Sequence, residues 1–185
     1  MIRDYHEFLK EVMIPEEKLQ QRIKELGAEI SRDYNGQPVL LVCILRGGVM
    51  FLTDLIRQIT TPVAIEFMAV SSYGRGARES TGNVRITLDL ISDISNCNVL
   101  IVEDIIDSGR TLASVIEILN ARRPKSLEVC TLLDKASRRE VQVPLRYRGF
   151  VIPNEFVFVY GLDIDEYYRN LTFIGSVDLD KYQAK

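Results

Sequence analysis

Continuous apolar runs alternate with helical stripes along this chain, and that alternation constrains its fold more than any other feature. Val39–Leu45 is an unbroken apolar run and 127–133 is a largely apolar one, which is typical of strands covered on both faces of a parallel sheet. Apolar residues recur at spacings of three and four over 19–30 and 112–119, as expected for helices with one buried face. The pattern predicts an α/β fold with a mostly parallel sheet and helices on both faces.

The rhythm changes after Lys135, where shorter and turn-rich pieces replace the long runs. A length of 185 residues fits one structural unit with a small appendage. We therefore expect an α/β core over 16–135 followed by a smaller C-terminal elaboration.

Composition and charge exclude several classes of function. His6 is the only histidine, which excludes a histidine-based catalytic triad and a multi-histidine metal site. The cysteines stand far apart without a Cys-x-x-Cys pair, so we expect neither a disulfide framework nor a zinc knuckle; they are Cys43, Cys97 and Cys130. The formal net charge of -3 gives no positive field for nucleic acid, and the basic clusters at 122–125 and 137–139 are interpreted as solvated loops beside helices. Mixed charges at the start and the lack of an apolar stretch of about 18 residues predict a cytoplasmic protein without a membrane partner.

The segment 99–112 carries the strongest signal for chemistry. It places Glu103, Asp104 and Asp107 after a buried apolar run, and ligands of parallel sheets bind at the carboxyl ends of the strands. Residues 108–111 (Ser-Gly-Arg-Thr) then open the next helix. A helix N-terminus with free amides, a glycine and hydroxyls is suited to holding a phosphate.

Carboxylates repel a phosphate, so Glu103 and Asp104 need a different task. They are suited to accepting hydrogen bonds from a sugar diol or to holding Mg²⁺ through water, which implies a sugar phosphate and a metal as ligands. The alternative is that Asp107 or Ser108 merely caps the helix, but capping does not explain an acidic pair that ends a buried strand. The chain has no P-loop motif, and Gly74-Arg75-Gly76 lacks the third glycine of a dinucleotide site.

At these residues the chain resembles the type I phosphoribosyltransferases, whose phosphoribosyl pyrophosphate (PRPP) motif is similar to 99–112. The surrounding pattern is similar to the hypoxanthine-guanine branch of that family, particularly its bacterial forms, and extends from Val12 to Gly175. The matching motifs occur in order along the chain: Leu45-Arg46-Gly47-Gly48, 71–74, 99–112, 132–135 and 156–171. The resemblance also implies a hood, built from 1–15 and 136–185, that covers a purine site.

The resemblance implies a role for each matching residue around PRPP. Glu103 and Asp104 would hold the ribose hydroxyls, and Mg²⁺ would be held by Glu103, Asp104 and Asp163. Asp107 would be the general acid/base at N7 of the purine. The 5′-phosphate would be held by Asp107, Ser108, Gly109, Arg110 and Thr111. Pyrophosphate would be held by Leu45, Arg46, Gly47 and Arg169, with a peptide bond between the first two that is often cis.

The purine side of the site depends more heavily on the resemblance. Lys135 would donate to the 6-oxo group, Phe156 would stack on the base and Val157 would read its edge, with Asp163 beside them. Read from the residues alone, a lysine after a strand is usually solvated and an aromatic in an apolar run is usually core. Asp163 follows the apolar run 156–162, read as a strand, which independently favours a site there. Ser72 and Tyr73 match lid residues, in a polar, glycine-rich segment over 71–82 whose length suits a lid.

The implied reaction is Mg²⁺-dependent transfer of 5-phosphoribosyl from PRPP to N9 of hypoxanthine or guanine, giving IMP or GMP and pyrophosphate in purine salvage. Family members are commonly homodimers or homotetramers. Glu155 stands where some members carry lysine, which leaves the ranking of the bases open, with hypoxanthine expected first. Three alternatives are a phosphoribosyltransferase for another base, an RNA-binding regulator on the same fold, and a non-catalytic nucleotide-binding module. Lys135 with Phe156 and Val157 disfavours a phosphoribosyltransferase for another base. The sequence pI near 5.3 disfavours the RNA-binding regulator, and an intact Asp107 with a long lid disfavours the non-catalytic module.

Overall fold

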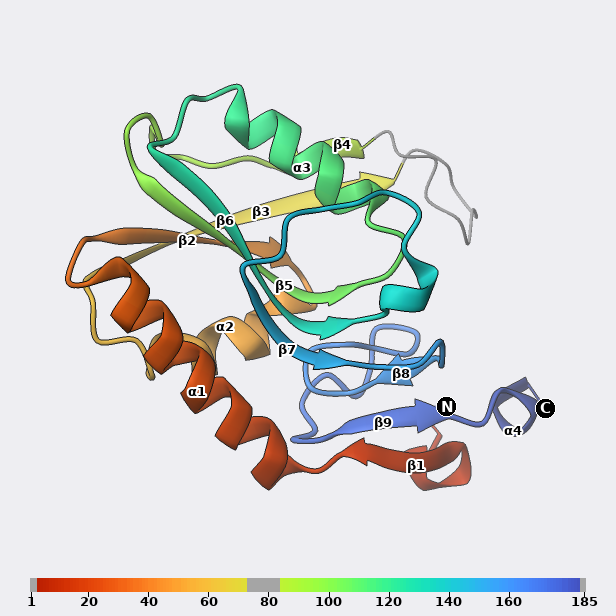
Figure 1. The fold of residues 1–185 in the computed structure, drawn as a ribbon. Coiled ribbons are helices and arrows are strands. Elements are labelled where there is room, and N and C mark those ends of the chain that lie inside the picture. Colours follow the sequence, from red (N-terminus) through yellow and green to blue (C-terminus); the bar gives the residue numbers. More distant parts are fainter. Residues whose placement is uncertain (1–2, 73–83, 184–185) are drawn as a thin grey trace.

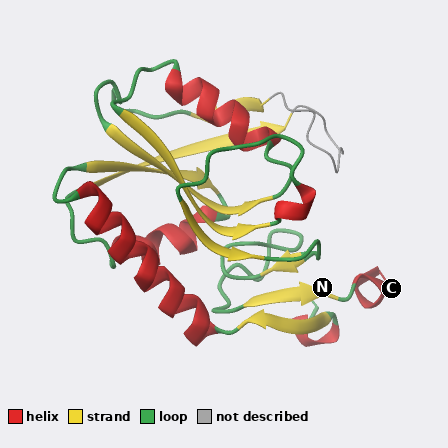
Figure 2. Cartoon of the chain, in the orientation of Figure 1, coloured by secondary structure: helices red, strands yellow, loops and turns green. Residues whose placement is uncertain are grey.

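A six-stranded sheet forms the centre of the molecule, with strand order β4-β3-β2-β5-β6-β7 (Figures 1 and 2). The structure is a computed structural model that describes residues 3–72 and 84–183. All neighbouring strands are parallel except β4, which runs antiparallel to β3. The strands are β2 (Val39–Leu45), β3 (Val63–Ser72), β4 (Val84–Leu88), β5 (Asn98–Ile106), β6 (Ser126–Asp134) and β7 (Tyr147–Val151). The predicted mostly parallel α/β fold is confirmed.

Helices cover both faces of this sheet. α1 (Glu16–Tyr34) and α2 (Gly48–Ile56) lie on one face, and α3 (Arg110–Asn120) lies on the other (Figure 1). Successive residues of β2 point to opposite faces, so Leu41 packs in the α1/α2 core and Leu40 packs in the α3 core. This two-sided burial explains why the strand reads as a continuous apolar run.

The two chain ends come together in a separate three-stranded antiparallel sheet of order β1-β9-β8. Its strands are β1 (Leu9–Ile14), β8 (Val157–Phe158) and β9 (Ile174–Val177). A small core of its own contains Phe8 and Phe158, whose ring centroids lie 5.5 Å apart. The remaining short helices are η1 (Tyr5–Glu7), η2 (Ala136–Arg138) and α4 (Leu179–Gln183). Both termini lie at this end of the molecule, and we call this sheet with its flanking loops the hood (Figure 1).

The structure corrects three boundaries expected from the sequence. The central sheet continues past residue 135, because β7 pairs with β6 from Cys130 to Asp134. β5 runs on to Ile106 and pairs with β6 up to that residue. Glu103 and Asp104 therefore lie within the strand, near its carboxyl end, rather than after it. The expected strand over 156–162 is wrong: only β8 is extended, since the φ angles of Val159 and Tyr160 are 71° and 52°.

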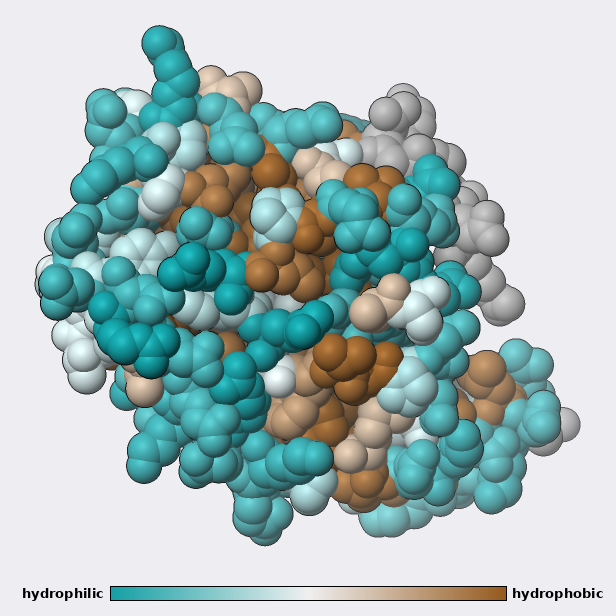
Figure 3. All heavy atoms as spheres, in the orientation of Figure 1, coloured by the Kyte–Doolittle hydropathy of each residue, from teal (hydrophilic) through white to brown (hydrophobic). Residues whose placement is uncertain are grey.

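The surface is largely polar, with apolar side chains gathered in the region of the edge strand β7 (Figure 3). Val151 in that strand is 59% exposed. Within the described residues, no helix combines the length and apolar character needed to cross a bilayer.

Candidate active site

The carboxyl ends of β2, β5 and β6 lie side by side, and they bring most of the predicted site residues to one edge of the sheet. Leu45 ends β2, Glu103 and Asp104 lie near the end of β5, and Lys135 follows β6. The Lys135 amide donates to the Ile106 carbonyl at 3.0 Å, which fixes the end of β6 against the end of β5.

Glu103 and Asp104 are partly buried, and this burial raises the pKa of both carboxyl groups. Burial raises the pKa of Asp104 to about 6, although its carboxylate accepts a 2.8 Å hydrogen bond from the Ile105 amide. Burial, and then the charge of Asp104, raises the pKa of Glu103 well above its ordinary value. Glu103 Oε2 is buried without a hydrogen-bond partner. Such carboxylates are suited to a ligand that brings hydroxyl donors or positive charge.

Gly47 allows the chain to pass close to this pair. A Cβ added at Gly47 would lie 1.6 Å from Asp104 Oδ2, so any side chain there would collide with the carboxylate. The preceding Leu45–Arg46 peptide bond is cis, as the resemblance implies for this dipeptide.

Residues 107–111, which we call the phosphate loop, comprise the turn before α3 and the first two residues of that helix. Gly109 is the N-cap, with a φ of 84°, and the Ser108 hydroxyl accepts a 3.4 Å hydrogen bond from the Arg110 amide at the start of α3. A Cβ at Gly109 would lie 2.5 Å from the Val141 carbonyl oxygen. The helix therefore begins at a tight glycine turn, and the first amides of a helix, which have no partner within it, favour an anion.

Asp107 and Lys135 meet at the entrance to this loop. Lys135 Nζ lies 3.7 Å from Asp107 Oδ2, and the lysine is 8% exposed rather than solvated. Burial lowers the pKa of Lys135, and the charge of Asp107 opposes that shift. Arg138 Nε donates to Asp107 Oδ1 at 3.0 Å.

Arg46 and Arg169 are joined by a carboxylate that the sequence analysis did not identify. Glu166 Oε2 lies 2.7 Å from Arg46 Nη1 and 2.9 Å from Arg169 Nη2. Asp163 pairs with the same Arg169 nitrogen at 2.8 Å. The two arginines expected at pyrophosphate are thus brought together, with Glu166 between them.

The predicted purine residues line the hood side. Phe156 is 49% exposed, so it is not a core aromatic, whereas Val157 is buried. Glu155 beside them pairs with Lys10 of β1 at 3.1 Å. Of the expected lid over 71–82, Ser71 and Ser72 are the last two residues of β3. Tyr73 and the remainder of the lid lie outside the described residues.

No ready-made metal centre accompanies this arrangement. Among residues 3–72 and 84–183, no group of three or more His, Cys, Asp or Glu side chains could hold a metal ion. Asp163 pairs with Arg169 instead of joining Glu103 and Asp104 in such a group. Mg²⁺ is usually held by one or two carboxylates together with substrate phosphates and water, which the acidic pair with its unpartnered oxygen fits.

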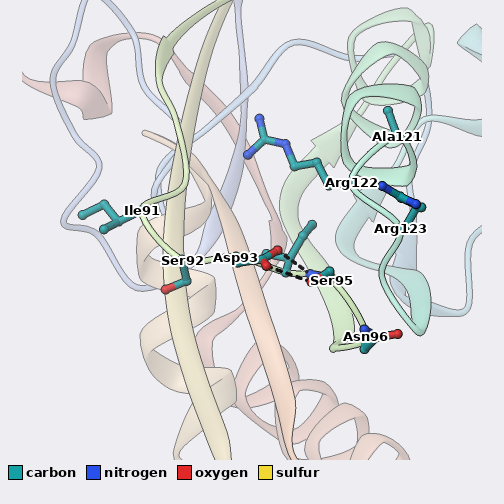
Figure 4. A pocket seen from close by; sticks show the side chains of 9 residues that line it. Ile91, Ser92, Asp93, Ser95, Asn96, Ala121, Arg122 and Arg123 are labelled. Atoms are coloured by element: carbon teal, nitrogen blue, oxygen red, sulfur yellow. Dashed lines mark hydrogen bonds between the residues drawn. The ribbon is translucent and has the colours of Figure 1, made fainter.

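A separate pocket of about 740 Å³ lies at the opposite end of β5, between 91–96 and the end of α3 (Figure 4). Its polar groups already have partners: Asp93 accepts from Ser95, and Arg122 pairs with Asp89. It contains none of the predicted site residues.

Comparison with known proteins identifies the family. The profile of the phosphoribosyl transferase domain matches residues 15–165. The chain belongs to the phosphoribosyltransferase family. It is 50% identical over 177 residues to a hypoxanthine-guanine phosphoribosyltransferase of Staphylococcus aureus, covering 96% of this chain and 98% of the relative. It is 53% identical over 171 residues to a hypoxanthine phosphoribosyltransferase of Salmonella typhimurium, covering 91% and 96%. A crystal structure of a hypoxanthine phosphoribosyltransferase from S. aureus matches with a TM-score of 0.93, 49% identity and 99% coverage of both chains.

Three polar residues of this phosphoribosyltransferase that touch the site were missed in the sequence analysis: Arg138, Arg139 and Glu166. The first two were read as part of a solvated loop, but the Arg139 side chain is only 8% exposed. The sequence signal for Arg138 and Arg139 as site residues is their position shortly after Lys135, at the carboxyl end of a buried strand.

Proposed function

We propose that this phosphoribosyltransferase acts in purine salvage, transferring 5-phosphoribosyl from PRPP to N9 of hypoxanthine and guanine. The observation that carries the proposal is the buried Lys135 beside Asp107, next to the phosphate loop. In its N7–H tautomer a 6-oxopurine presents the O6 acceptor beside a proton on N7. The Lys135 ammonium suits O6 and the Asp107 carboxylate suits the N7 proton, whereas the amino group of adenine would oppose a lysine donor. The relatives named for hypoxanthine and guanine support the same substrates.

In the proposed mechanism, binding residues hold both ends of PRPP while the base approaches its anomeric carbon. The phosphate loop holds the 5′-phosphate through amides and hydroxyls, and Phe156 and Val157 hold the purine. Positive charge builds on the ribose ring as pyrophosphate leaves, and Arg46 and Arg169 stabilise the departing anion. As N9 bonds to the anomeric carbon, Asp107 accepts the proton from N7, and Lys135 stabilises charge on O6.

We propose Mg²⁺ as the metal, held by Glu103 and Asp104 together with the substrate, with Asp163 as a further ligand. When bound, the ion would neutralise charge on the diphosphate. The buried, unpartnered Glu103 Oε2 supports this assignment.

For the assembly, we propose a homodimer or homotetramer that uses the face of the sheet beyond α2. Ile65 and Phe67 on β3 align with Leu41 and Cys43, which α1 and α2 cover, yet both are 39% exposed. Leu88 on β4 and Met50 on α2 are 44% and 37% exposed. A second copy would cover this apolar face. The cytoplasm remains the proposed location, in keeping with the free thiols of all three cysteines.

The test is a spectrophotometric assay with PRPP, offering hypoxanthine, guanine, xanthine, adenine and uracil separately, with Mg²⁺ and with a chelator. We expect turnover of hypoxanthine and guanine with stoichiometric pyrophosphate release, and its loss when Mg²⁺ is removed. Turnover of adenine or uracil alone would assign a different base. Absence of turnover with every base, despite PRPP binding, would favour the RNA-binding regulator.

A further inference from the structure

The segment after β6 packs directly beneath the phosphate loop. The Glu140 and Val141 amides donate to the Ser108 carbonyl at 2.9 and 3.0 Å. Arg139 Nη1 donates to the Asp107 carbonyl at 2.8 Å. The loop is therefore held from below by three hydrogen bonds from one short stretch of chain.

The Arg139 guanidinium also reaches the end of β6. Its Nη2 forms a short ion pair with Asp134, and the two side chains are 8% and 3% exposed. Asp134 immediately precedes Lys135, the residue proposed to contact the purine. One buried guanidinium thus connects the strand end that carries the base-reading lysine to the loop that begins with Asp107.

The fit around Arg139 is close. A Cβ at Gly109 would lie 3.1 Å from Arg139 Cδ and 3.3 Å from its Nη1. A planar guanidinium can donate in two directions from a fixed fork, whereas the ammonium of lysine is a compact point charge on a flexible stem. Lysine at this position would keep the charge but could not hold the carboxylate and the carbonyl in the same geometry.

We propose that Arg139 is a positioning residue, which holds the phosphate loop in the conformation that binds the 5′-phosphate and keeps it in register with Lys135. This inference rests on the proposed assignment of the 5′-phosphate to residues 107–111. Arg139 itself, directed beneath the loop, acts through Asp107 and Asp134 and does not touch the substrate.

Arg148 provides a matched control in the same network. Its Nη1 lies 3.1 Å from Asp134 Oδ2, but its side chain is 51% exposed, and among the described residues it makes no hydrogen bond to the loop. Substituting either arginine removes one partner of Asp134. Only Arg139 links that carboxylate to the Asp107 carbonyl.

The experiment compares wild type, Arg139→Lys and Arg148→Lys as full chains, with thermal unfolding to confirm folding. Titration calorimetry measures the Kd of ribose 5-phosphate and of pyrophosphate, and kinetics measure kcat and KM for PRPP. We expect Arg139→Lys to raise the Kd of ribose 5-phosphate and the KM for PRPP about tenfold, with the Kd of pyrophosphate within about twofold of wild type. Arg148→Lys should leave all these constants within about twofold.

An unchanged Kd of ribose 5-phosphate in Arg139→Lys would overturn the inference, as would equal increases in both variants. If Arg139→Lys does not fold, Asp134→Asn replaces it, which weakens the same link and should raise that Kd by a smaller factor; no increase there would also overturn the inference. The double variant Ser108→Ala/Thr111→Ala tests the underlying assignment separately. If it binds ribose 5-phosphate like wild type, the phosphate loop is not the phosphate site and the assignment itself fails.

Discussion

At the scale of single residues, the buried charge of Asp104 suits it to bind a ligand but lowers the free energy of unfolding. Its carboxyl group is enclosed beside Glu103, and burial raises its pKa from 3.8 to about 6. In the ligand-free protein above pH 6 the folded state therefore holds a charge that solvent would stabilise better, and this lowers the free energy of unfolding.

We predict that Asp104→Asn raises the free energy of unfolding of the ligand-free protein by roughly 1–2 kcal/mol at pH 8. The folded state binds the Asp104 proton more tightly than the unfolded state, so the gain should shrink as pH falls from about 6 to about 4. Urea unfolding across this range measures it. Asp93→Asn is the opposite control, because hydrogen bonds from Ser95 lower the pKa of Asp93 and its loss should destabilise the protein. A destabilised Asp104→Asn protein at pH 8 would contradict the argument.

Glu166 gives a second prediction at this scale. Its carboxylate lies between Arg46 and Arg169, the two arginines proposed for pyrophosphate, so an incoming anion must displace it. We predict that Glu166→Gln lowers the Kd of pyrophosphate about two- to fivefold, a modest effect because the groups are partly exposed. Calorimetry measures it, with Glu25→Gln on α1 as the control for loss of one acidic charge. A higher Kd in Glu166→Gln would mean that Glu166 organises the arginines instead of competing for them.

Residues at the site differ in how far the sequence could predict them. Glu103 and Asp104 could be identified because they follow a buried apolar run, where an unpaired charge is unfavourable unless a ligand or partner compensates it. The distant contacts of Arg139 and Glu166 could not be predicted, because the Asp107 carbonyl and Arg46 lie 32 and 120 residues away from them in the chain. Only the folded arrangement shows that one is enclosed and the other joins two arginines.

At the scale of elements, the turn from β2 to α2 is built around a close approach. Gly47 lies against Asp104, and a Cβ at Gly161 would lie 2.1 Å from the Gly47 carbonyl oxygen. The turn is thus enclosed between the acidic pair and a loop of the hood, and it has no room for a side chain.

We predict that Gly47→Ala displaces the Asp104 carboxylate and lowers kcat/KM for PRPP at least about 100-fold. Steady-state kinetics measure it. Gly36→Ala is the control: a Cβ there meets nothing within 4 Å, but the φ of 77° makes the substitution cost about 1 kcal/mol of stability. The control should lower the melting temperature without changing kcat/KM. Equal kinetics in both variants would show that Asp104 tolerates displacement.

Elements were predictable where two-sided burial leaves a pattern. β2 and β6 read as apolar runs because helices cover both their faces. β7 is a short edge strand with mixed exposure, and its sequence Tyr-Arg-Gly-Phe-Val carries no comparable signal. The stretch 156–162 misled in the opposite direction, since only Val157–Phe158 form a strand, and Val159 and Tyr160 are buried with positive φ angles.

At the scale of the whole molecule, the sheet face with Ile65 and Phe67 leaves two apolar side chains 39% exposed. We predict that Phe67→Asp shifts the protein to smaller species in sedimentation velocity, because a charge on that face cannot be buried between two copies. Ile91→Asp is the control, since Ile91 is 93% exposed and lies in the loop between β4 and β5. A Phe67→Asp protein that sediments like wild type would place the contact between copies elsewhere.

The pairing of β1 with β9 has a consequence for biosynthesis. Leu9 lies opposite Val177, so β1 can form its hydrogen bonds only after β9, the last described strand, has been made. On the ribosome, strands β2 to β6 are made before 174–177 are translated, so they can begin to pair first. The half of the site that holds the phosphate can thus form first, and the hood closes over it after β9 has been made. A prematurely terminated chain would carry the phosphate loop without the cover that the purine needs.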